Sequence, residues 1–253
     1  MDNCSIWKFL DECSLNDYTL LIPSVAVGNV AQLTCDLLIS SLNMKKIASV
    51  YSPAQIPVIG YDPYDLKSTN LSSSCEVYKS ELKKICILQV RSPLVFKYAK
   101  IFLEEIIDVF KKKQIRDIII LTSSFAHEKK HILSSQFTCV VSRDNEFYKE
   151  NIKATDVTVN QDNDGDIKIF GGGFAGLLYK ICVIKHVPSL VLFKYCSEGD
   201  NIPDAYDMIR NLSTIHLLFS EEKDLYSQLT PPVSWNYLFG RPNYNININD
   251  LTG

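Results

Sequence analysis

The chain has 253 residues, of which 46% are hydrophobic and 22% are charged, and it carries a net charge of −3 at pH 7. These proportions are typical of a folded globular protein and exclude a mainly disordered chain. The slightly acidic balance also disfavours a dedicated nucleic-acid-binding protein, whose surface would be basic. At this length a single domain buries enough surface to fold without disulfides or metal ions.

The first residues of the chain and its cysteines indicate in which cellular compartment the protein is expected. Residues 1–17 contain acidic side chains where a secretory signal would have a basic start and an apolar block. The longest uncharged run, 18–35, includes proline, glycine and several polar residues, so it is a poor membrane span. The eight cysteines include no CxxC pair, and we interpret them as buried thiols. We therefore expect an intracellular protein.

In the N-terminal half, apolar runs that are typical of strands alternate with a helical pattern. A turn at Gly28 and Asn29 precedes apolar residues that recur on one helical face through Leu42, which predicts the first helix. The prolines and serines of residues 52–74 predict a long surface connection. The predicted strands cover residues 18–22, 46–51, 75–79 and 85–90, the last two as a hairpin or as neighbours.

The C-terminal half continues the alternation. Apolar spacing predicts a helix over 98–110 that closes on the lysines of 111–113, which we interpret as a solvated helix end because cations favour a helix C-terminus. Residues 125–155 are predicted to be a charged connector. Further strands are expected over 118–121, 167–170 and 190–195, and further helices after the glycines of 171–173 and from Pro203 onward.

The order of these elements predicts the fold class. Strands that alternate with helices and are apolar throughout indicate a mostly parallel central sheet covered on both faces, which is an α/β/α three-layer sandwich. We assign residues 1–229 to a single α/β domain. Residues 230–253 are rich in proline and asparagine and are expected to form a C-terminal tail anchored by Trp235.

Residues 127–131 match the H-E-x-x-H pattern of zinc hydrolases. In those enzymes two histidines one helical turn apart bind the metal and the glutamate acts as a base. A third ligand is required, and Glu150 is the one candidate that follows. The lysines at 129 and 130 are typical of an exposed segment, so we interpret the pattern as a solvated charged turn and expect no metal site.

Residues 160–167 resemble the first eight positions of a calcium-binding loop. The twelfth position, which needs a bidentate glutamate, is Gly171. The flanking residues alternate like strands, and Asp164 followed by Gly165 is a hairpin turn signal. We interpret the segment as a hairpin that binds no calcium.

Residues 171–176 satisfy the G-x-G-x-x-G pattern between a predicted strand and a predicted helix, which is the context of a phosphate-binding turn. Glu198 stands near the spacing of the acidic residue that binds a ribose. Adjacent glycines equally serve a tight turn or close packing. No nucleophile–base pair accompanies them, because His186 and His216 are isolated. A phosphorylase-like or nucleotide-binding enzyme using the Gly171–Gly176 turn is the alternative function, and we assign no cofactor.

Four blocks of sequence resemble the proteasome assembly chaperone family. They are residues 21–44, the triple glycine at 171–173, the run F-K-Y-C-S-E-G-D-N-I-P-D-A at 193–205, and residues 234–240. The blocks follow one another in the family's order and span nearly the whole chain, and the third is the most specific. The positions that the resemblance assigns to structure or to partner contact are Ser24, Gly28, Asn29, Gly171, Gly172, Gly173, Ser197, Glu198, Gly199, Asp200, Asn201, Pro203, Asp204, Trp235, Phe239 and Gly240.

The resemblance implies a chaperone without catalytic activity. Members of the family pair with proteasome assembly chaperone 1, hold α subunits of the 20S proteasome, promote formation of the α-ring and prevent off-pathway α-ring dimers. The implied fold is an α/β/α sandwich related to nucleoside phosphorylases, and the implied location is the cytoplasm and nucleus. No nucleic acid, membrane or cofactor is implied.

The end of the chain departs from a pattern of this wider group. Relatives can dock a C-terminal tripeptide, hydrophobic–tyrosine–any, between α subunits, whereas this chain ends in Leu251, Thr252 and Gly253. Threonine stands in the tyrosine position. We therefore expect the partner chaperone to supply that anchor, while these three residues stay candidate proteasome contacts.

The run from Ser197 to Asp204 allows two interpretations. As a strand-to-helix turn, it uses Gly199 for an unusual backbone conformation and Pro203 for the first turn of the following helix. Its acidic residues would favour that helix's N-terminus. Alternatively, the run contacts a partner directly. The sequence leaves both open.

Overall fold

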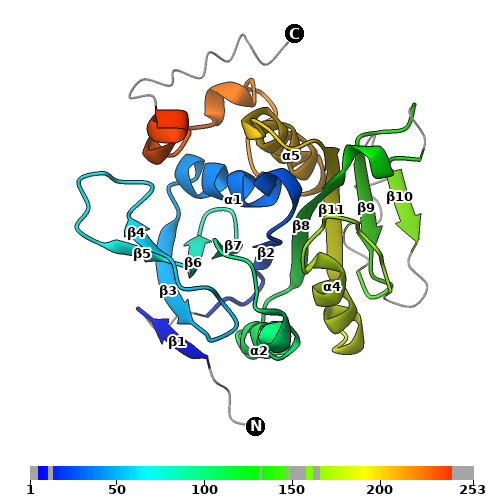
Figure 1. Cartoon of the computed structure of the whole chain (residues 1–253), viewed down its shortest axis with the longest axis horizontal. Helices are drawn as coiled ribbons and strands as arrows, with labels where there is room; N and C mark the ends of the chain where they lie inside the picture. Colours follow the sequence, from blue (N-terminus) through cyan, green and yellow to red (C-terminus); the bar gives the residue numbers. More distant parts are fainter. Residues whose placement is uncertain are drawn as a thin grey trace.

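The computed structural model describes residues 5–10, 14–130, 133–145, 148, 158–161 and 166–240. Within this part of the chain, nine strands form one sheet in the order β1–β3–β6–β7–β2–β8–β11–β9–β10 (Figure 1). The strands are β1 (Ile6–Phe9), β2 (Thr19–Pro23), β3 (Lys45–Tyr51), β6 (Cys75–Ser80), β7 (Ile85–Val90), β8 (Asp117–Phe125), β9 (Phe137–Val141), β10 (Thr158–Gln161) and β11 (Ser189–Cys196).

The sheet is mixed. Its centre, β7–β2–β8–β11, is parallel throughout, and β10 runs parallel to β9. The other neighbours, β1 with β3, β3 with β6, β6 with β7 and β9 with β11, are antiparallel. The expected parallel arrangement therefore holds for the centre, while a short turn joins β6 to β7 as a hairpin, which forces an antiparallel pair.

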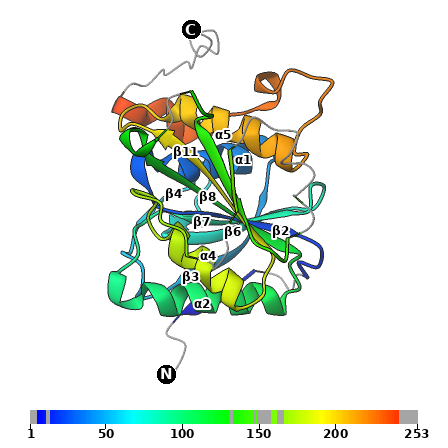
Figure 2. The ribbon, with the colours of Figure 1, turned by 90° about the vertical axis from the view of Figure 1, so that its right-hand side faces the viewer.

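In the described ranges, two α-helices cover each face of the sheet (Figures 1 and 2). The helices α1 (Val30–Ser41) and α5 (Ile202–Ile215) contact each other on one face, and α2 (Phe96–Lys112) and α4 (Ala175–Ile184) do so on the other. No helix in the described ranges is both long enough and apolar enough to cross a membrane. The α/β class and the three-layer sandwich are confirmed.

The alternation of side chains along the central strands builds two separate cores. On β2, Leu21 packs with the α1/α5 layer, whereas Leu20 and Ile22 pack with the α2/α4 layer. On β8, Ile119 packs with the α1/α5 layer and Ile118 packs with the α2/α4 layer. Successive strand residues point to opposite faces, so a strand covered on both faces must be apolar at every position. This explains the continuous apolar runs in the sequence.

Several segments differ from the expectation. The long connection 52–74 contains a separate two-stranded sheet, β4 (Ile59–Tyr61) paired with β5 (Leu71–Ser73). The connector 125–155 contains β9, and the N-terminal segment contains the edge strand β1. These strands are short and, apart from β9, they lie at edges or outside the main sheet, so they lack the long apolar runs of the centre.

The expected strand over residues 167–170 is wrong. The segment is irregular, and its carbonyl groups bond to other elements. The Phe170 carbonyl accepts a hydrogen bond of 2.9 Å from the Ser124 hydroxyl, and the Ile169 carbonyl accepts one of 3.0 Å from the Gly172 N–H. The hairpin expected over 157–169 is also wrong, because β10 pairs with β9 instead; residues 162–165 lie outside the described ones.

Candidate functional site

Three of the four family blocks meet at one edge of the sheet. The strands β2, β8 and β11 are parallel neighbours, so their carboxyl ends lie at the same edge, where α/β proteins commonly place their binding sites. Ser24 follows β2 directly, and residues 197–201 follow β11. The glycine turn lies between them, and from it α4 begins (Figures 1 and 2). Positions nearly 180 residues apart in the sequence are thereby brought together.

The Ser24 hydroxyl connects the first block to the glycine turn. It donates a 2.8 Å hydrogen bond to the Gly172 carbonyl and accepts one of 2.8 Å from the Phe174 N–H. The Thr122 hydroxyl of β8 donates to the same Gly172 carbonyl at 2.9 Å. Ser24 and Thr122 are fully buried. The turn is therefore fastened to two central strands by side-chain hydroxyl groups.

The turn packs so closely against the first block that a side chain does not fit. Gly173 has a φ of +61°, and a Cβ there would lie 2.1 Å from the Val25 carbonyl oxygen and 2.6 Å from Ser24 Oγ. A Cβ on Gly28 would lie 2.6 Å from Oδ1 of Asn201, in the third block. Gly171 accepts a 3.0 Å hydrogen bond from the Val27 N–H. Glycine is needed here for close packing between segments.

Backbone N–H groups that could bind a phosphate at this turn already form hydrogen bonds within the protein. The N–H groups of Gly172, Phe174 and Ala175 all donate hydrogen bonds inside the protein. The start of α4 is also covered, since a Cβ on Gly176 would lie 2.7 Å from the carbonyl oxygen of Ile167. A phosphate site needs free N–H groups at an open helix N-terminus. The nucleotide-binding alternative is therefore not favoured.

A buried lysine in the third block was missed by the sequence analysis. Lys194 is only 2% exposed, and its Nζ lies 2.6 Å from Asp204 Oδ1 and 2.7 Å from Asp207 Oδ2. These ion pairs join β11 to the first turns of α5. A buried ammonium group needs such partners, because desolvation of an unpaired charge is costly. A lysine within an otherwise apolar strand is the sequence signal that could have revealed the pair.

The rest of the third block divides into a structural part and an exposed part. Asn201 is buried, and its amide donates to Asp204 Oδ2 at 2.7 Å and to the Ser197 carbonyl at 2.9 Å. Asp200 accepts a 3.1 Å hydrogen bond from the Ile202 N–H, and Pro203 stands in the first turn of α5. The side chains that face solvent are those of Ser197, Glu198 and Asp200, with Gly199 between them.

An aromatic surface continues this exposed part. Phe170, beside the glycine turn, is 58% exposed. Phe125, at the end of β8, stacks on the ring of His127 with centroids 5.2 Å apart. We call Phe170, His127, Ser197, Glu198 and Asp200 the strand-end surface. It offers aromatic rings next to two carboxylate side chains, a combination suited to binding a protein surface.

The fourth block lies elsewhere. Trp235 is 4% exposed and belongs to the buried cluster that includes residues of α1 and α5. Its neighbour Ser234 donates a backbone hydrogen bond of 3.2 Å to the Pro63 carbonyl. Phe239 and Gly240 close the 3₁₀ segment η4 (Val233–Gly240). Leu251, Thr252 and Gly253 lie outside the described residues.

The two metal-like motifs do not form sites in the described ranges. The helical turn at η2 (Ala126–Glu128) ends at Lys129, whose backbone is extended. Within the described part of the chain, no three His, Cys, Asp or Glu side chains gather in a way that could hold a metal ion. His131, Glu150 and residues 162–165 lie outside it.

Comparison with known proteins identifies the family. The model of the PAC2 family matches residues 20–225. The chain belongs to the PAC2 family. Among curated members, proteasome assembly chaperone 2 of Homo sapiens is 34% identical over 245 residues, which cover 89% of this chain and 93% of the human protein. Proteasome assembly chaperone 2 of Xenopus tropicalis is 32% identical over 242 residues, covering 89% and 92%. The resemblance noted in the sequence is confirmed.

Solved structures of archaeal proteins share the fold at much lower identity. PbaA of Pyrococcus furiosus, an archaeal homolog of proteasome-assembly chaperone, superposes with a TM-score of 0.67 at 15% identity, over 88% of this chain and 91% of that one. PbaB of the same organism, an archaeal proteasome activator, gives a TM-score of 0.65 at 17% identity, over 88% and 92%. At these identities the likeness concerns the fold alone.

Proposed function

We propose that this protein is a non-catalytic assembly chaperone of the 20S proteasome. It acts as a heterodimer with proteasome assembly chaperone 1, binds α subunits, promotes α-ring formation and keeps α-rings from dimerising off the pathway. It works in the cytoplasm and nucleus. The support for the chaperone class is the family membership and the full-length similarity to proteins named proteasome assembly chaperone 2.

The structural observation that supports the proposal is that polar groups of the glycine turn form hydrogen bonds inside the protein. The N–H groups of Gly172, Phe174 and Ala175 and the Ser24 hydroxyl form internal hydrogen bonds, while the neighbouring strand-end surface is exposed. An enzyme of this architecture would need the opposite arrangement, with free donors facing a cleft. A binding protein needs only the exposed surface, and the closely packed turn would then serve to position that surface.

The enzyme alternative also lacks a reactive pair in the described ranges. His127 is exposed and stacks on Phe125, and its Nε2 lies 3.7 Å from Glu128 Oε1. Nδ1 of His216 lies 3.3 Å from the Tyr148 hydroxyl. This pair lies at the amino ends of the central strands, whereas the glycine turn lies at their carboxyl ends. Neither histidine has an adjacent serine or cysteine nucleophile in the contacts given by the structure.

Affinity purification of the tagged full chain, followed by native mass spectrometry, tests the proposal. We expect a 1:1 complex with proteasome assembly chaperone 1, together with α subunits and few β subunits. Phe170→Asp should weaken recovery of at least one of these partners, because it places a charge in the strand-end surface. Ile184→Asp is the matched control, since Ile184 is 66% exposed at the opposite end of α4.

Two results would contradict the proposal. If neither a chaperone partner nor α subunits are recovered from the tagged wild-type chain, the assigned function is wrong. If the wild-type chain binds nucleotide at micromolar concentration and Gly173→Ala abolishes this binding while the protein stays folded, the enzyme alternative is supported instead.

A further inference from the structure

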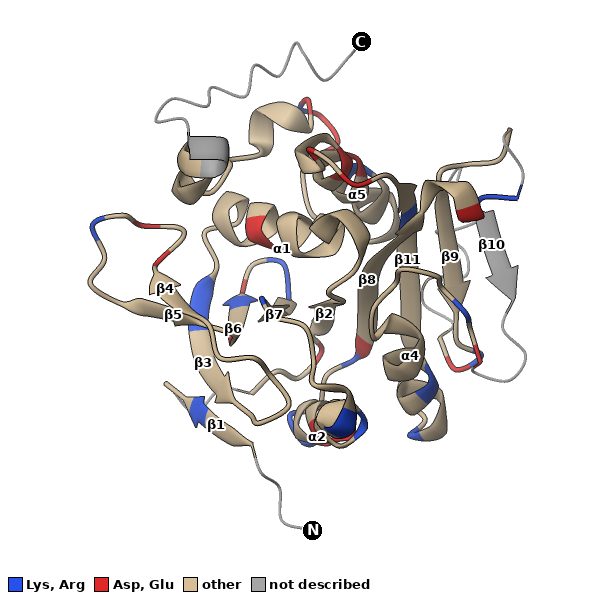
Figure 3. Ribbon diagram, viewed as in Figure 1, with Lys and Arg blue, Asp and Glu red and all other residues tan. Residues whose placement is uncertain are grey.

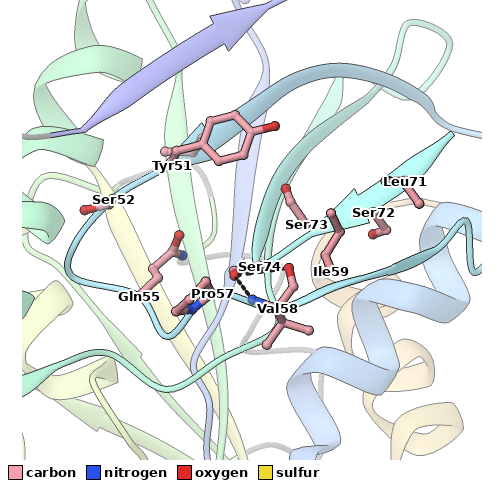
Figure 4. A pocket seen from close by; sticks show the side chains of 11 residues that line it. Tyr51, Ser52, Gln55, Pro57, Val58, Ile59, Leu71, Ser72, Ser73 and Ser74 are labelled. Atoms are coloured by element: carbon pink, nitrogen blue, oxygen red, sulfur yellow. Dashed lines mark hydrogen bonds between the residues drawn. The ribbon is translucent and has the colours of Figure 1, made fainter.

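A pocket of about 390 Å³ lies between the end of β3 and the small β4–β5 sheet, on the far side of the main sheet from β10 (Figures 1 and 4). This volume is in the range of pockets that bind ligands. Its lining consists of Val50, Tyr51, Ser52, Gln55, Pro57, Val58, Ile59, Leu71, Ser72, Ser73 and Ser74. No residue in this lining is charged.

The pocket is held open by the backbone. The pairing of β3 with β6 ends at Ser49 and Glu76, whereas β3 itself continues to Tyr51. The chain then turns away, and Ser74 fixes it there. The Ser74 hydroxyl accepts a 2.8 Å hydrogen bond from the Val58 N–H (Figure 4). It also donates one of 2.9 Å to the Ile56 carbonyl. Because these bonds are internal, the walls do not depend on a ligand.

Buried ionic and hydroxyl groups brace the same wall. Glu76 is 1% exposed and forms an ion pair with Lys46. It also accepts hydrogen bonds of 2.7 Å from the Ser72 hydroxyl and 3.0 Å from the Ser73 N–H. These contacts tie β5 to the main sheet. The backbone walls of the pocket are therefore formed before any ligand binds.

One buried polar side chain in the lining lacks a proper partner. Gln55 is only 6% exposed, yet neither its amide oxygen nor its amide nitrogen bonds to a nitrogen or oxygen atom in the described part of the chain. Among the described residues, its side chain makes a polar contact with the thiol of Cys75. Burial raises the pKa of this thiol to about 12. A thiol is a weak hydrogen-bonding group. Buried amides are normally satisfied, so an unsatisfied one in a pocket indicates a missing partner.

The rim of the pocket is apolar and extends beyond it. Ile59 is 71% exposed, Tyr61 83%, Leu71 54%, Tyr51 49% and Val58 45%. The strands β4 and β5 carry no charged residue (Figure 3). Exposed apolar patches of this kind, next to a formed pocket, mark sites of interaction with other proteins. The lining carries no charge, and the Lys46 ammonium in the wall is already paired with Glu76. A phosphorylated, acidic or basic ligand would therefore lose its hydration without gaining an unpaired counter-charge.

We propose that this pocket binds an extended, uncharged peptide segment of a partner protein. One aliphatic side chain enters the pocket, and the peptide group next to it pairs with the Gln55 amide. The segment's remaining aliphatic side chains cover Ile59 and Leu71. The proposal goes beyond the assembly function and does not depend on which protein supplies the segment.

The chemistry favours a peptide over other occupants. A primary amide presents one acceptor and two donors, which match the N–H and C=O of a peptide group. In an extended chain, side chains on the same face recur about every 7 Å, so one can fill the pocket while the next reaches the rim. A small apolar molecule would leave both the Gln55 amide and the rim unmatched. In other complexes with extended peptides, pockets that accept alternate side chains give the specificity.

Fluorescence anisotropy with a defined probe tests the proposal. The probe is a terminally blocked, fluorophore-labelled nonapeptide that alternates serine with isoleucine or leucine. We expect it to bind the full wild-type chain with a Kd on the order of 1–100 μM, a range of roughly −8 to −5.5 kcal/mol. The same peptide with glutamate at its central aliphatic position should bind at least tenfold more weakly.

Two variants and one control locate the binding. Gln55→Met keeps the volume but removes the amide, and Val58→Arg places a charge on the rim; each should weaken probe binding at least tenfold. Leu82→Arg should leave binding unchanged, because Leu82 is 88% exposed in the turn at the opposite end of β6. The melting temperature of Gln55→Met should be unchanged or higher, since an unsatisfied buried amide stabilises nothing.

Four outcomes would overturn the proposal. One is a wild-type chain that does not bind the probe. The second is equal binding of the aliphatic and the glutamate-containing peptides. The third is probe binding that survives both Gln55→Met and Val58→Arg. The fourth is sedimentation showing that the wild-type chain self-associates and that Val58→Arg abolishes this, which would make a second copy of the chain the occupant. The assembly function is tested by recovery of partners in the co-purification, and the peptide pocket is tested by binding of the probe. Each proposal can therefore fail without the other.

Discussion

The ammonium nitrogen of the buried Lys194 lies 2.6 Å from a carboxylate oxygen of Asp204, and this ion pair links β11 to α5. Both residues belong to the most specific block of the family sequence. Asp204 also accepts a hydrogen bond from Asn201, which in turn lies against Gly28 of the first block. The pair is thus part of a chain of contacts that holds the strand-end surface in place.

Asp204→Ala should destabilise the protein. The substitution leaves the buried Lys194 with Asp207 alone and removes a partner of Asn201, so we expect a loss of about 1–3 kcal/mol in the free energy of unfolding. Urea denaturation followed by circular dichroism measures this. Glu198→Ala is the control, because an exposed substitution in the same run should change stability by less than about 0.5 kcal/mol. Equal effects of the two substitutions would contradict the structural role of the pair.

Gly199→Val should also destabilise the protein, for a different reason. Gly199 has a φ of +153°, which residues with a side chain rarely adopt, while a Cβ there would meet no atom within 4 Å. The cost is therefore one of backbone strain, about 1–3 kcal/mol. Thermal unfolding checks it. An unchanged melting temperature combined with loss of partner binding would instead show that this position acts as a contact.

Gly173→Ala should be more damaging than a substitution at an open glycine. The added Cβ would lie 2.1 Å from the Val25 carbonyl oxygen, where neither backbone segment can move freely. We expect a loss of about 2–4 kcal/mol from steric overlap and the positive φ. Gly60→Ala is the matched control, since a Cβ there meets nothing within 4 Å. Similar unfolding midpoints for the two variants would show that the turn relaxes without cost.

His216 should make the protein less stable at acidic pH. Burial, and secondarily the nearby Arg116, lower the pKa of His216 below its usual 6.5, while Asp117 opposes the shift. The unfolded chain therefore takes up a proton at a higher pH than the folded one. Stability should fall as the pH drops below about 6.5, by at most about 1.4 kcal/mol per pH unit for one group.

The comparison of wild type with His216→Gln isolates this contribution. Between pH 7.5 and 5.5 the wild type should lose more stability than the variant, because only the wild type carries the titrating imidazole. The Tyr148 hydroxyl, 3.3 Å from Nδ1, can still bond to the glutamine amide. Identical pH dependence of the two denaturation midpoints would contradict the lowered pKa.

Much of the fold could be predicted from local patterns. The apolar runs at 18–22, 118–121 and 190–195 became the central strands, and the amphipathic spacing at 98–110 became α2. The central strands lie between two helix layers, so nearly every one of their residues is buried, and their apolar runs are easy to recognise in the sequence. Short edge elements such as β1, β4 and β5 leave weak marks because fewer of their residues are buried.

The sequence by itself determined the α/β class, the family and the absence of a persuasive catalytic pattern. Only the tertiary structure decided that Ser24, Gly173 and Asn201 meet at one edge, that Lys194 pairs with Asp204, and that residues 167–170 cover a turn instead of forming a strand. The physical reason is the range of the interactions. The periodicity of apolar residues along the chain indicates which positions are buried, and it can be read from neighbouring residues alone. Which distant segment buries it depends on strand order and direction, which no local pattern specifies.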